Sequence, residues 1–289
     1  MTPLSRFEIH QPQSAAEASQ MLAQYGDEAG IYAGGTELLL AMRHGALRYR
    51  HLIDIKLIHG LNTIQLPNGR LQIGAAATHR SIERSDVVGQ KQPVLAEMES
   101  HVANVRVRAS GTLGGNLCFA EPHSDPATLL LVLDASVKLE SSAGGRELGV
   151  GEFIGGAYSS NLQPGEILTS VSVPCAQSTH RAAYMKFQVH ERPTLGVALW
   201  LETPDHGANF TSARVALGCV CPFPRRVGNA ESLLTGSRAE VEKRFPEAAD
   251  AMAGAAELLD DHEGSADYKR NLIRVFLQRA FRKALGESD

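Results

Sequence analysis

The first segment of the chain, residues 1–55, alternates short apolar strands with helices. A glycine pair separates the second strand from the second helix. Ser14 and Glu17 form a capping box at the start of the first helix, and Thr36 is placed to cap the second. The predicted strands are residues 7–9, 30–33 and 51–55, and the predicted helices are residues 15–25 and 37–43.

The second segment has the turn chemistry of a hairpin, followed by helices and then strands. Asn68-Gly69 lies between two apolar runs and predicts a tight β-turn. Residues 78–107 are mostly helical in pattern, with a break at Gln92-Pro93. The remaining predicted elements are a short apolar helix at 125–134 and strands at 136–140 and 166–173.

A third segment follows a boundary at residues 174–180. It begins with alternating stretches rich in β-branched and aromatic residues and then turns helical. The strands are expected at residues 182–189, 196–202 and 213–220, and the helices at residues 239–245, 246–259 and 268–285. Together the patterns predict an α+β protein with segments 1–55, 56–177 and 178–289.

Composition is that of an ordinary globular protein, with 43% hydrophobic and 21% charged residues. The net charge of −4 gives no basic footprint for nucleic acid. The first residues lack the pattern of a signal peptide and no apolar run is long enough to cross a membrane, so we expect a cytoplasmic protein.

Cysteine and histidine patterns predict neither disulfides nor a metal site. The four cysteines, Cys118, Cys175, Cys219 and Cys221, form no framework of the secreted type. Cys219 and Cys221 are expected on one side of an extended segment, as two reduced core cysteines. Five histidines are scattered without metal-ligand spacing: His79, His101, His123, His180 and His190.

The most informative feature is a pair of glycine loops. The first glycine loop, residues 31–37, contains Gly34-Gly35, and the second glycine loop, residues 110–116, contains Gly114-Gly115. Adjacent glycines let a backbone approach a ligand closely with its N–H groups exposed, which suits a diphosphate. Two such loops suggest a long, two-ended cofactor.

Each motif also has a purely structural interpretation. Gly34-Gly35 suits a tight strand-to-helix turn, and it matches neither a dinucleotide fingerprint nor a phosphate-binding P-loop. Ser124-Asp125 can bind sugar hydroxyls, or it can cap the helix that begins at Pro126. No nucleophile elbow or acid–base constellation is present, so a cofactor is expected to perform any chemistry.

Taken together, these motifs resemble the FAD-binding medium subunit of the molybdenum hydroxylases. The order of the two glycine loops and Ser124-Asp125 carries the resemblance, supported by residues 52–55, 73–75 and 184–187. It implies an FAD-binding fold of the vanillyl-alcohol oxidase type, with two subdomains, followed by a C-terminal α+β domain. The family also contains members with an extra cluster held by inserted cysteines, and this chain has no cysteine before Cys118.

The resemblance also implies the site. The first glycine loop would wrap the diphosphate, the second would form the opposing wall, and Ser124-Asp125 would bind the sugar or polyol. Lys186 would lie near the flavin and Leu195 beside its ring, and no protein group would be catalytic because the flavin is the redox group. The implied FAD-binding residues are Ile31, Tyr32, Ala33, Gly34, Gly35, Thr36, Glu37, Leu38, Gly111, Thr112, Gly114, Gly115, Asn116, Cys118, Ser124, Asp125, Lys186 and Leu195.

By the same resemblance, the chain takes electrons from iron–sulfur clusters and passes them through FAD to an external acceptor. A large subunit would hold a molybdopterin cofactor and a small subunit two iron–sulfur clusters, in a heterohexamer. Two alternatives stay open: a stand-alone FAD-dependent oxidase or dehydrogenase of the same superfamily, and a nucleotide-sensing or scaffold protein. Intact glycines argue against the latter, and the short C-terminal segment argues against the former.

Overall fold

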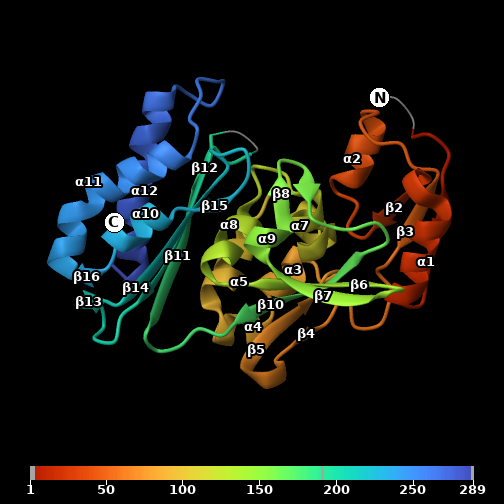
Figure 1. The fold of residues 1–289 in the computed structure, drawn as a ribbon, viewed down its shortest axis with the longest axis horizontal. Helices are drawn as coiled ribbons and strands as arrows, with labels where there is room; N and C mark the ends of the chain where they lie inside the picture. Colours follow the sequence, from red (N-terminus) through yellow and green to blue (C-terminus); the bar gives the residue numbers. More distant parts are fainter. Residues whose placement is uncertain (1–3, 190–191, 288–289) are drawn as a thin grey trace.

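The computed structural model describes residues 4–189 and 192–287. Three sheets lie in succession along the long axis of the molecule, in chain order (Figure 1). The mixture of helices and sheets confirms the predicted α+β class. Among the described residues, no helix is both long enough and apolar enough to span a bilayer.

The first sheet is parallel, with β3 between β1 and β2. Helix α1 packs on it through Ala18, and Ser14 caps α1 as predicted by accepting a hydrogen bond from the Glu17 N–H at 3.1 Å. Its elements are β1 (Glu8–His10), α1 (Ala15–Tyr25), a 3-10 turn (Gly26–Glu28), β2 (Ala29–Tyr32), α2 (Leu38–Arg43) and β3 (His51–Asp54).

The second sheet has the order β4-β5-β10-β6-β7 and is antiparallel throughout. Asn68 and Gly69 both have positive φ, 52° and 74°, which confirms the predicted Asn-Gly turn. Its strands are β4 (Ile64–Gln65), β5 (Arg70–Gly74), β6 (Ser136–Ser141), β7 (Gly144–Gly149) and β10 (Ile167–Pro174), with a small hairpin of β8 (Ile154–Gly156) and β9 (Ser159–Ser160).

Seven helices accompany this second sheet. Helix α8 is buried at every position, because it lies between the second sheet and the third. The helices are α3 (His79–Glu83), α4 (Asp86–Lys91), α5 (Pro93–Ser100), α6 (Val105–Ser110), α7 (Leu113–Phe119), α8 (Asp125–Val132) and α9 (Val150–Phe153).

The third sheet, β11-β12-β14-β15, is antiparallel and carries a helical layer on its far side (Figure 1). Its elements are β11 (His180–Phe187), β12 (Leu195–Glu202), β14 (Ser212–Gly218), β15 (Arg225–Arg226), the short pair β13 (Asn209–Phe210) and β16 (Gly236–Ser237), and helices α10 (Gly228–Leu233), α11 (Arg238–Ala255) and α12 (Ala266–Ala284).

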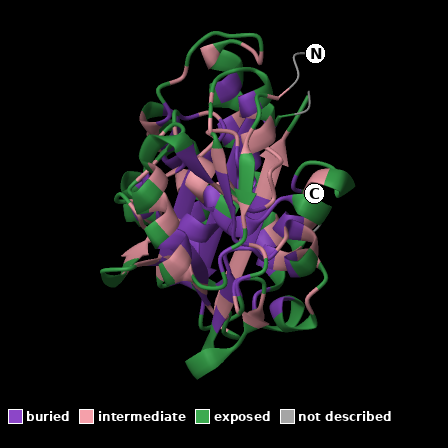
Figure 2. Cartoon of the chain, turned by 90° about the vertical axis from the view of Figure 1, so that its right-hand side faces the viewer, coloured by how far each residue is buried: buried purple, intermediate pink, exposed green. Residues whose placement is uncertain are grey.

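Strand β12 is buried on both faces. For the whole molecule, Figure 2 shows that the buried residues gather in the interior. Ala198 and Trp200 join the core of the second segment, whereas Val197 and Leu199 join the core under α11 and α12. Alternate residues of a strand face opposite sides, so one strand serves two cores. The second and third segments therefore share a continuous apolar interior.

Four local predictions are wrong, and tertiary hydrogen bonds account for two of them, because Gly114 donates to the Ala75 carbonyl and Cys219 to the Pro122 carbonyl. Thr36 does not cap α2, whose N-cap is Glu37 with no side-chain bond. Gly114-Gly115 belongs to helix α7 and not to a loop. The two helices expected around Pro246 form one helix, α11, although proline normally weakens a helix interior. Cys219 has a φ of 67°, so it leaves the extended segment expected to hold both thiols; both remain free and buried.

The C-terminal core gives a first test. Phe281 is 1% exposed and its ring contacts Phe210 and Phe245 at centroid distances of 5.1 and 4.9 Å. We expect Phe281→Ala to lower the free energy of unfolding by about 3–5 kcal/mol, because it leaves a cavity. Val275→Ala on the same helix, where Val275 is 39% exposed, is the control and should cost under about 1 kcal/mol. Urea unfolding of both variants measures the difference, and equal losses would contradict this packing.

Candidate functional site

The two glycine loops lie directly against each other. A Cβ on Gly34 would overlap the carbonyl oxygen of Ser110 and would lie 2.7 Å from Cα of Gly111. A Cβ on Gly111 would lie 3.4 Å from the Thr36 hydroxyl. The structure thus joins two segments that the sequence places far apart, and glycine is required at Gly34 because backbone meets backbone there.

The first glycine loop presents four successive backbone donors at residues 34–37, after residues 31 and 32 have paired in β2. Within the described part of the chain, no acceptor takes the N–H groups of Gly34, Gly35, Thr36 or Glu37. These four residues are half-buried, and Gly35 has a φ of 70°. Consecutive free amides in a tight turn form an anion-binding concavity. This arrangement fits a diphosphate, and the assignment of the loop to the FAD diphosphate stays a prediction.

The second glycine loop uses its backbone donors within the protein. The N–H groups of Leu113 and Gly114 donate to Ala77 and Ala75 at 3.1 and 3.0 Å, and the Gly115 N–H donates to the Thr112 hydroxyl at 3.1 Å. A Cβ on Gly114 would lie 2.6 Å from that of Ala75. Here the glycines let α7 pack closely on the sheet, so the second loop offers a wall and not an amide nest.

Side chains beyond α7 continue this wall. The Ser124 hydroxyl donates to Oδ1 of Asn116 at 2.6 Å, which joins two residues of the predicted site. Ser124 is the N-cap residue of α8, but its hydroxyl accepts no hydrogen bond from the first turn of that helix. The prediction that the Ser124 side chain caps the helix is therefore wrong. The Asn116 amide is thereby oriented, with its nitrogen left for another partner.

Asp125 forms a buried three-residue cluster with Tyr184 and Lys186. Its Oδ1 accepts from the Tyr184 hydroxyl at 2.6 Å and its Oδ2 from Lys186 Nζ at 2.9 Å. Lys186 also donates to the carbonyl of His101 at 2.6 Å. Burial and then the Asp125 carboxylate raise the pKa of Tyr184 well above its usual value, so Tyr184 remains a neutral donor. Both carboxylate oxygens of Asp125 are therefore occupied by protein donors, and the cluster ties α8 to β11.

Glu121 connects three further segments near the glycine loops. It accepts hydrogen bonds from the His123 N–H at 3.0 Å, the Tyr158 hydroxyl at 3.2 Å and Arg192 at 2.8 Å. Burial raises the pKa of Glu121, but the bonds and charges of His123 and Arg192 outweigh it and lower the pKa. Burial opposes the charge of Arg192, yet Glu121, Tyr158 and Glu37 raise its pKa, so it stays charged.

A second buried pair, His79 and Glu99, lies next to Gly111, where the two glycine loops meet. His79 Nδ1 lies 2.6 Å from Oε2 of Glu99, with the two side chains 3% and 0% exposed. The His79 ring would lie 3.2 Å from a Cβ on Gly111. The backbone N–H of His79 donates to the Gly111 carbonyl. Sequence reasoning missed both His79 and Glu121, because only their tertiary neighbours distinguish them from scattered polar residues.

Leu195 and Cys118 are two further residues predicted to bind FAD, and neither is an exposed residue. Leu195 is 1% exposed and belongs to the C-terminal core. Cys118 is half-buried as a residue, and burial of its thiol raises its pKa to about 12, so it is a neutral thiol. Their assignment to FAD stays a prediction. His190, among the scattered histidines, lies outside the described residues.

Comparisons with known proteins match the whole arrangement. Residues 5–176 match the FAD binding domain in molybdopterin dehydrogenase, and residues 182–284 match the CO dehydrogenase flavoprotein C-terminal domain. The carbon monoxide dehydrogenase medium chain of Hydrogenophaga pseudoflava is 31% identical over 96% of this chain and 97% of its own. The xanthine dehydrogenase FAD-binding subunit of Escherichia coli O157:H7 is 31% identical over 77% of each chain.

Solved structures agree with these matches. The carbon monoxide dehydrogenase of Hydrogenophaga pseudoflava that lacks the Mo-pyranopterin moiety superposes with a TM-score of 0.92 at 30% identity, covering 99% of both chains. Quinoline 2-oxidoreductase from Pseudomonas putida 86 gives a TM-score of 0.91 at 28% identity, again with 99% of both chains. The predicted fold, an FAD-binding part followed by a C-terminal domain, is confirmed.

The Asp125–Lys186 pair predicts a strong energetic coupling. Asp125→Asn leaves a charged ammonium without its carboxylate, and Lys186→Met leaves the carboxylate unpaired. A double-mutant cycle should give a coupling of about 1–3 kcal/mol in urea unfolding. The exposed pair Lys138–Glu140, with side chains 52% and 35% exposed, is the control and should couple by under about 1 kcal/mol. Equal couplings would show that the buried cluster adds nothing.

Glu121 predicts a pH-dependent stability. Its pKa is lowered in the folded protein, so its contribution is complete above the unfolded value near 4.5 and is lost as pH falls through the lower folded value. The difference in unfolding free energy between the protein and Glu121→Gln should therefore shrink as pH falls below about 4.5. Thermal unfolding at several pH values measures it, and a pH-independent difference would contradict the assignment.

Proposed function

Because the chain belongs to the family of FAD-binding subunits of molybdopterin dehydrogenases, we propose that it is the electron-transferring flavin subunit of a molybdenum hydroxylase complex. Its relatives are oxidoreductase subunits, and it carries the FAD-binding domain of that family. When bound, FAD supplies the redox chemistry by accepting and releasing electrons at its flavin ring. The residues of the chain bind the cofactor and adjust its surroundings.

The observation that carries the proposal is the row of free N–H groups at residues 34–37. A diphosphate is rich in acceptors and negatively charged, so it satisfies donors that the protein leaves unpaired. We assign the second glycine loop to the other side of the diphosphate, and the Asn116 amide and the Ser124 hydroxyl, which are hydrogen-bonded to each other, to the polyol end. By the family resemblance we also assign Lys186, whose ammonium is paired with Asp125, to the surroundings of the flavin.

This assignment changes the role proposed for Asp125. Since both its carboxylate oxygens accept from Tyr184 and Lys186, we assign it to positioning Lys186, and not to direct binding of the sugar or polyol. Ser124 and Asn116 remain the side chains proposed to contact the polyol part. The division into residues 1–55, 56–177 and 178–289 likewise remains part of the proposal.

The proposed partners are a large subunit with the molybdopterin cofactor and a small subunit with two iron–sulfur clusters. The names of relatives support this, since one is the carbon monoxide dehydrogenase medium chain and another is the nicotine 6-hydroxylase medium subunit. Two copies of each subunit form the proposed heterohexamer. In this assembly the chain takes electrons from the clusters and passes them to an external acceptor, while the large subunit selects the substrate.

A stand-alone flavin oxidase is the competing function. It requires a substrate-shaped site within this chain, but the third sheet is covered by the second segment on one face and by α11 and α12 on the other. The match to the medium chain also runs over the full length of both proteins. The observed packing therefore favours a subunit that relies on partners for substrate binding.

The decisive variant is Gly34→Ala. Its methyl group overlaps the backbone at Ser110, so the two loops must separate at a cost of about 1–3 kcal/mol. We expect FAD binding to weaken about 10–100-fold, measured by the visible flavin absorbance retained after gel filtration. Complexes assembled with this variant should lose reduction of an external acceptor dye to a similar extent.

Gly89→Ala is the matched control, since a Cβ at this helical glycine meets nothing within 4 Å. It should keep full flavin content and activity. A wild-type chain that takes up no FAD would refute the proposal. Substrate turnover by the isolated flavin-loaded chain would favour the stand-alone oxidase, and full activity of a flavin-free Gly34→Ala complex would favour a scaffold.

A further inference from the structure

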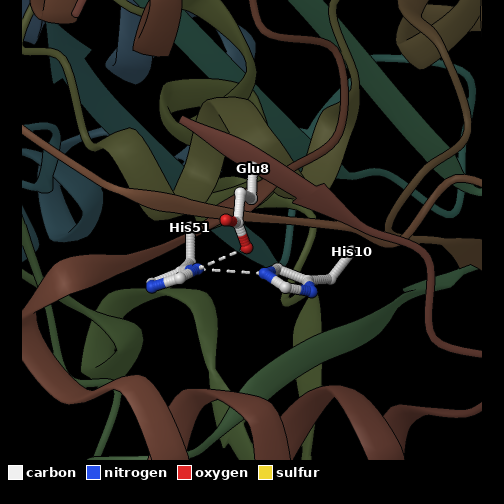
Figure 3. A group of neighbouring side chains, drawn as sticks. All are labelled: Glu8, His10 and His51. Carbon is white, nitrogen blue, oxygen red and sulfur yellow. Dashed lines mark hydrogen bonds and ion pairs between the residues drawn. The ribbon is translucent and has the colours of Figure 1, made fainter. Parts of the chain in front are cut away.

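A cluster of three metal-binding side chains lies on the first sheet. Glu8 and His10 are two residues apart on β1, so they point to the same face, and His51 stands on the neighbouring strand β3, in register with Glu8 (Figure 3). Parallel pairing of two short strands thus brings together residues that the sequence separates. Spacing along the chain alone predicts no metal site here.

The distances within this cluster suit a metal ion. Nε2 of His10 and Nδ1 of His51 are 3.0 Å apart, Oε2 of Glu8 is 3.8 Å from the same His51 nitrogen, and one ligand atom of each residue lies within 4.8 Å of the others. Ligands at about 2.0–2.1 Å from a tetrahedral metal lie roughly 3.3 Å from each other. Small rotations of the exposed Glu8 side chain and of the two half-buried imidazoles bring the three donors to that separation.

The two imidazoles are held in place by Tyr25 at the end of α1. Its ring stacks on that of His51, with centroids 3.9 Å apart and planes at 16°, and on that of His10 at 4.9 Å and 26°. Stacked rings cannot turn freely, so both ligands are partly preorganised. The Glu8 side chain is 75% exposed, which leaves an open path for an ion and for a water as fourth ligand.

This cluster is separate from the predicted FAD site. Strands β1, β2 and β3 are parallel, and Glu8, Ala29 and His51 stand level at their amino ends. The first glycine loop leaves β2 at the opposite, carboxyl end, after Tyr32. A ligand at one end therefore does not replace a ligand at the other.

We propose that Glu8, His10 and His51 form a surface site for a divalent late transition metal, with Zn²⁺ as its representative. Two imidazoles and one carboxylate suit Zn²⁺ or Cu²⁺, whereas Ca²⁺ and Mg²⁺ prefer oxygen ligands. Without a metal, the facing nitrogens of His10 and His51 form one hydrogen bond. A bound ion needs a lone pair from both nitrogens, so the imidazole that donates in the metal-free protein carries its proton on its other ring nitrogen when the ion binds.

Titration of the full-length, FAD-loaded chain with Zn²⁺, in competition with a chromophoric chelator, tests the site. We expect one bound Zn²⁺ per chain, with affinity about tenfold or more weaker in His10→Gln, His51→Gln and Glu8→Gln. His59→Gln removes another exposed histidine outside the cluster and is the control, with unchanged affinity. Flavin absorbance and circular dichroism identify any variant that has failed to fold.

Electron paramagnetic resonance of the Cu²⁺-loaded chain gives a second, structural readout. Two imidazole nitrogens should couple to the copper in the wild type, and one in either His variant. Absence of Zn²⁺ uptake by the wild type would overturn the proposal. So would equal affinities in His10→Gln, His51→Gln and His59→Gln, because they would place the metal on other residues.

Discussion

The approach of backbone to backbone between Gly34 and residues 110–111 is the contact on which the rest of the site depends. No side chain fits between these segments, so the two loops meet only because Gly34 has no Cβ. The contact fixes the first loop against a helical wall while its own amides stay free. Close packing on one side and open donors on the other together make a place for an extended anion.

Buried polar groups hold that place together from several directions. The Asp125 cluster connects α8 to β11, the Glu121 cluster connects the segment after α7 to Tyr158 and Arg192, and His79 with Glu99 lies beneath Gly111. Asp125 is paired with Lys186, Glu121 with Arg192, and one oxygen of Glu99 with His79, which offsets part of the cost of removing these groups from water. The other oxygen of Glu99 is buried and has no partner among the described residues. The clusters belong to different sequence segments, so they fix the relative placement of the second and third sheets as well as the loops.

A single strand extends this coupling into the core. Because β12 is buried on both faces, packing of the C-terminal helices and packing around α8 depend on the same backbone. In the proposed complex, this shared interior gives the flavin a rigid frame on which partner subunits can assemble. The small parallel sheet lies at the opposite end of the molecule from the third sheet (Figure 1), and the proposed metal site there combines the exposed Glu8 with two half-buried histidines.

The sequence by itself determined the α+β class, most strands and helices, the glycine loops and the family, because periodicity, turn residues and glycine pairs are local signals. Only the tertiary structure decided how those signals are used. The two glycine pairs look alike in sequence. Among the described residues, the N–H groups of Gly34 and Gly35 have no acceptor, whereas those of Gly114 and Gly115 donate to the Ala75 carbonyl and the Thr112 hydroxyl. From the sequence Asp125 is predicted to bind sugar, and only the structure shows that its carboxylate accepts hydrogen bonds from Tyr184 and Lys186. His10 and His51 meet only through strand pairing. Hydrogen-bond partners and facing side chains come from segments distant in the chain, so local sequence patterns do not predict them.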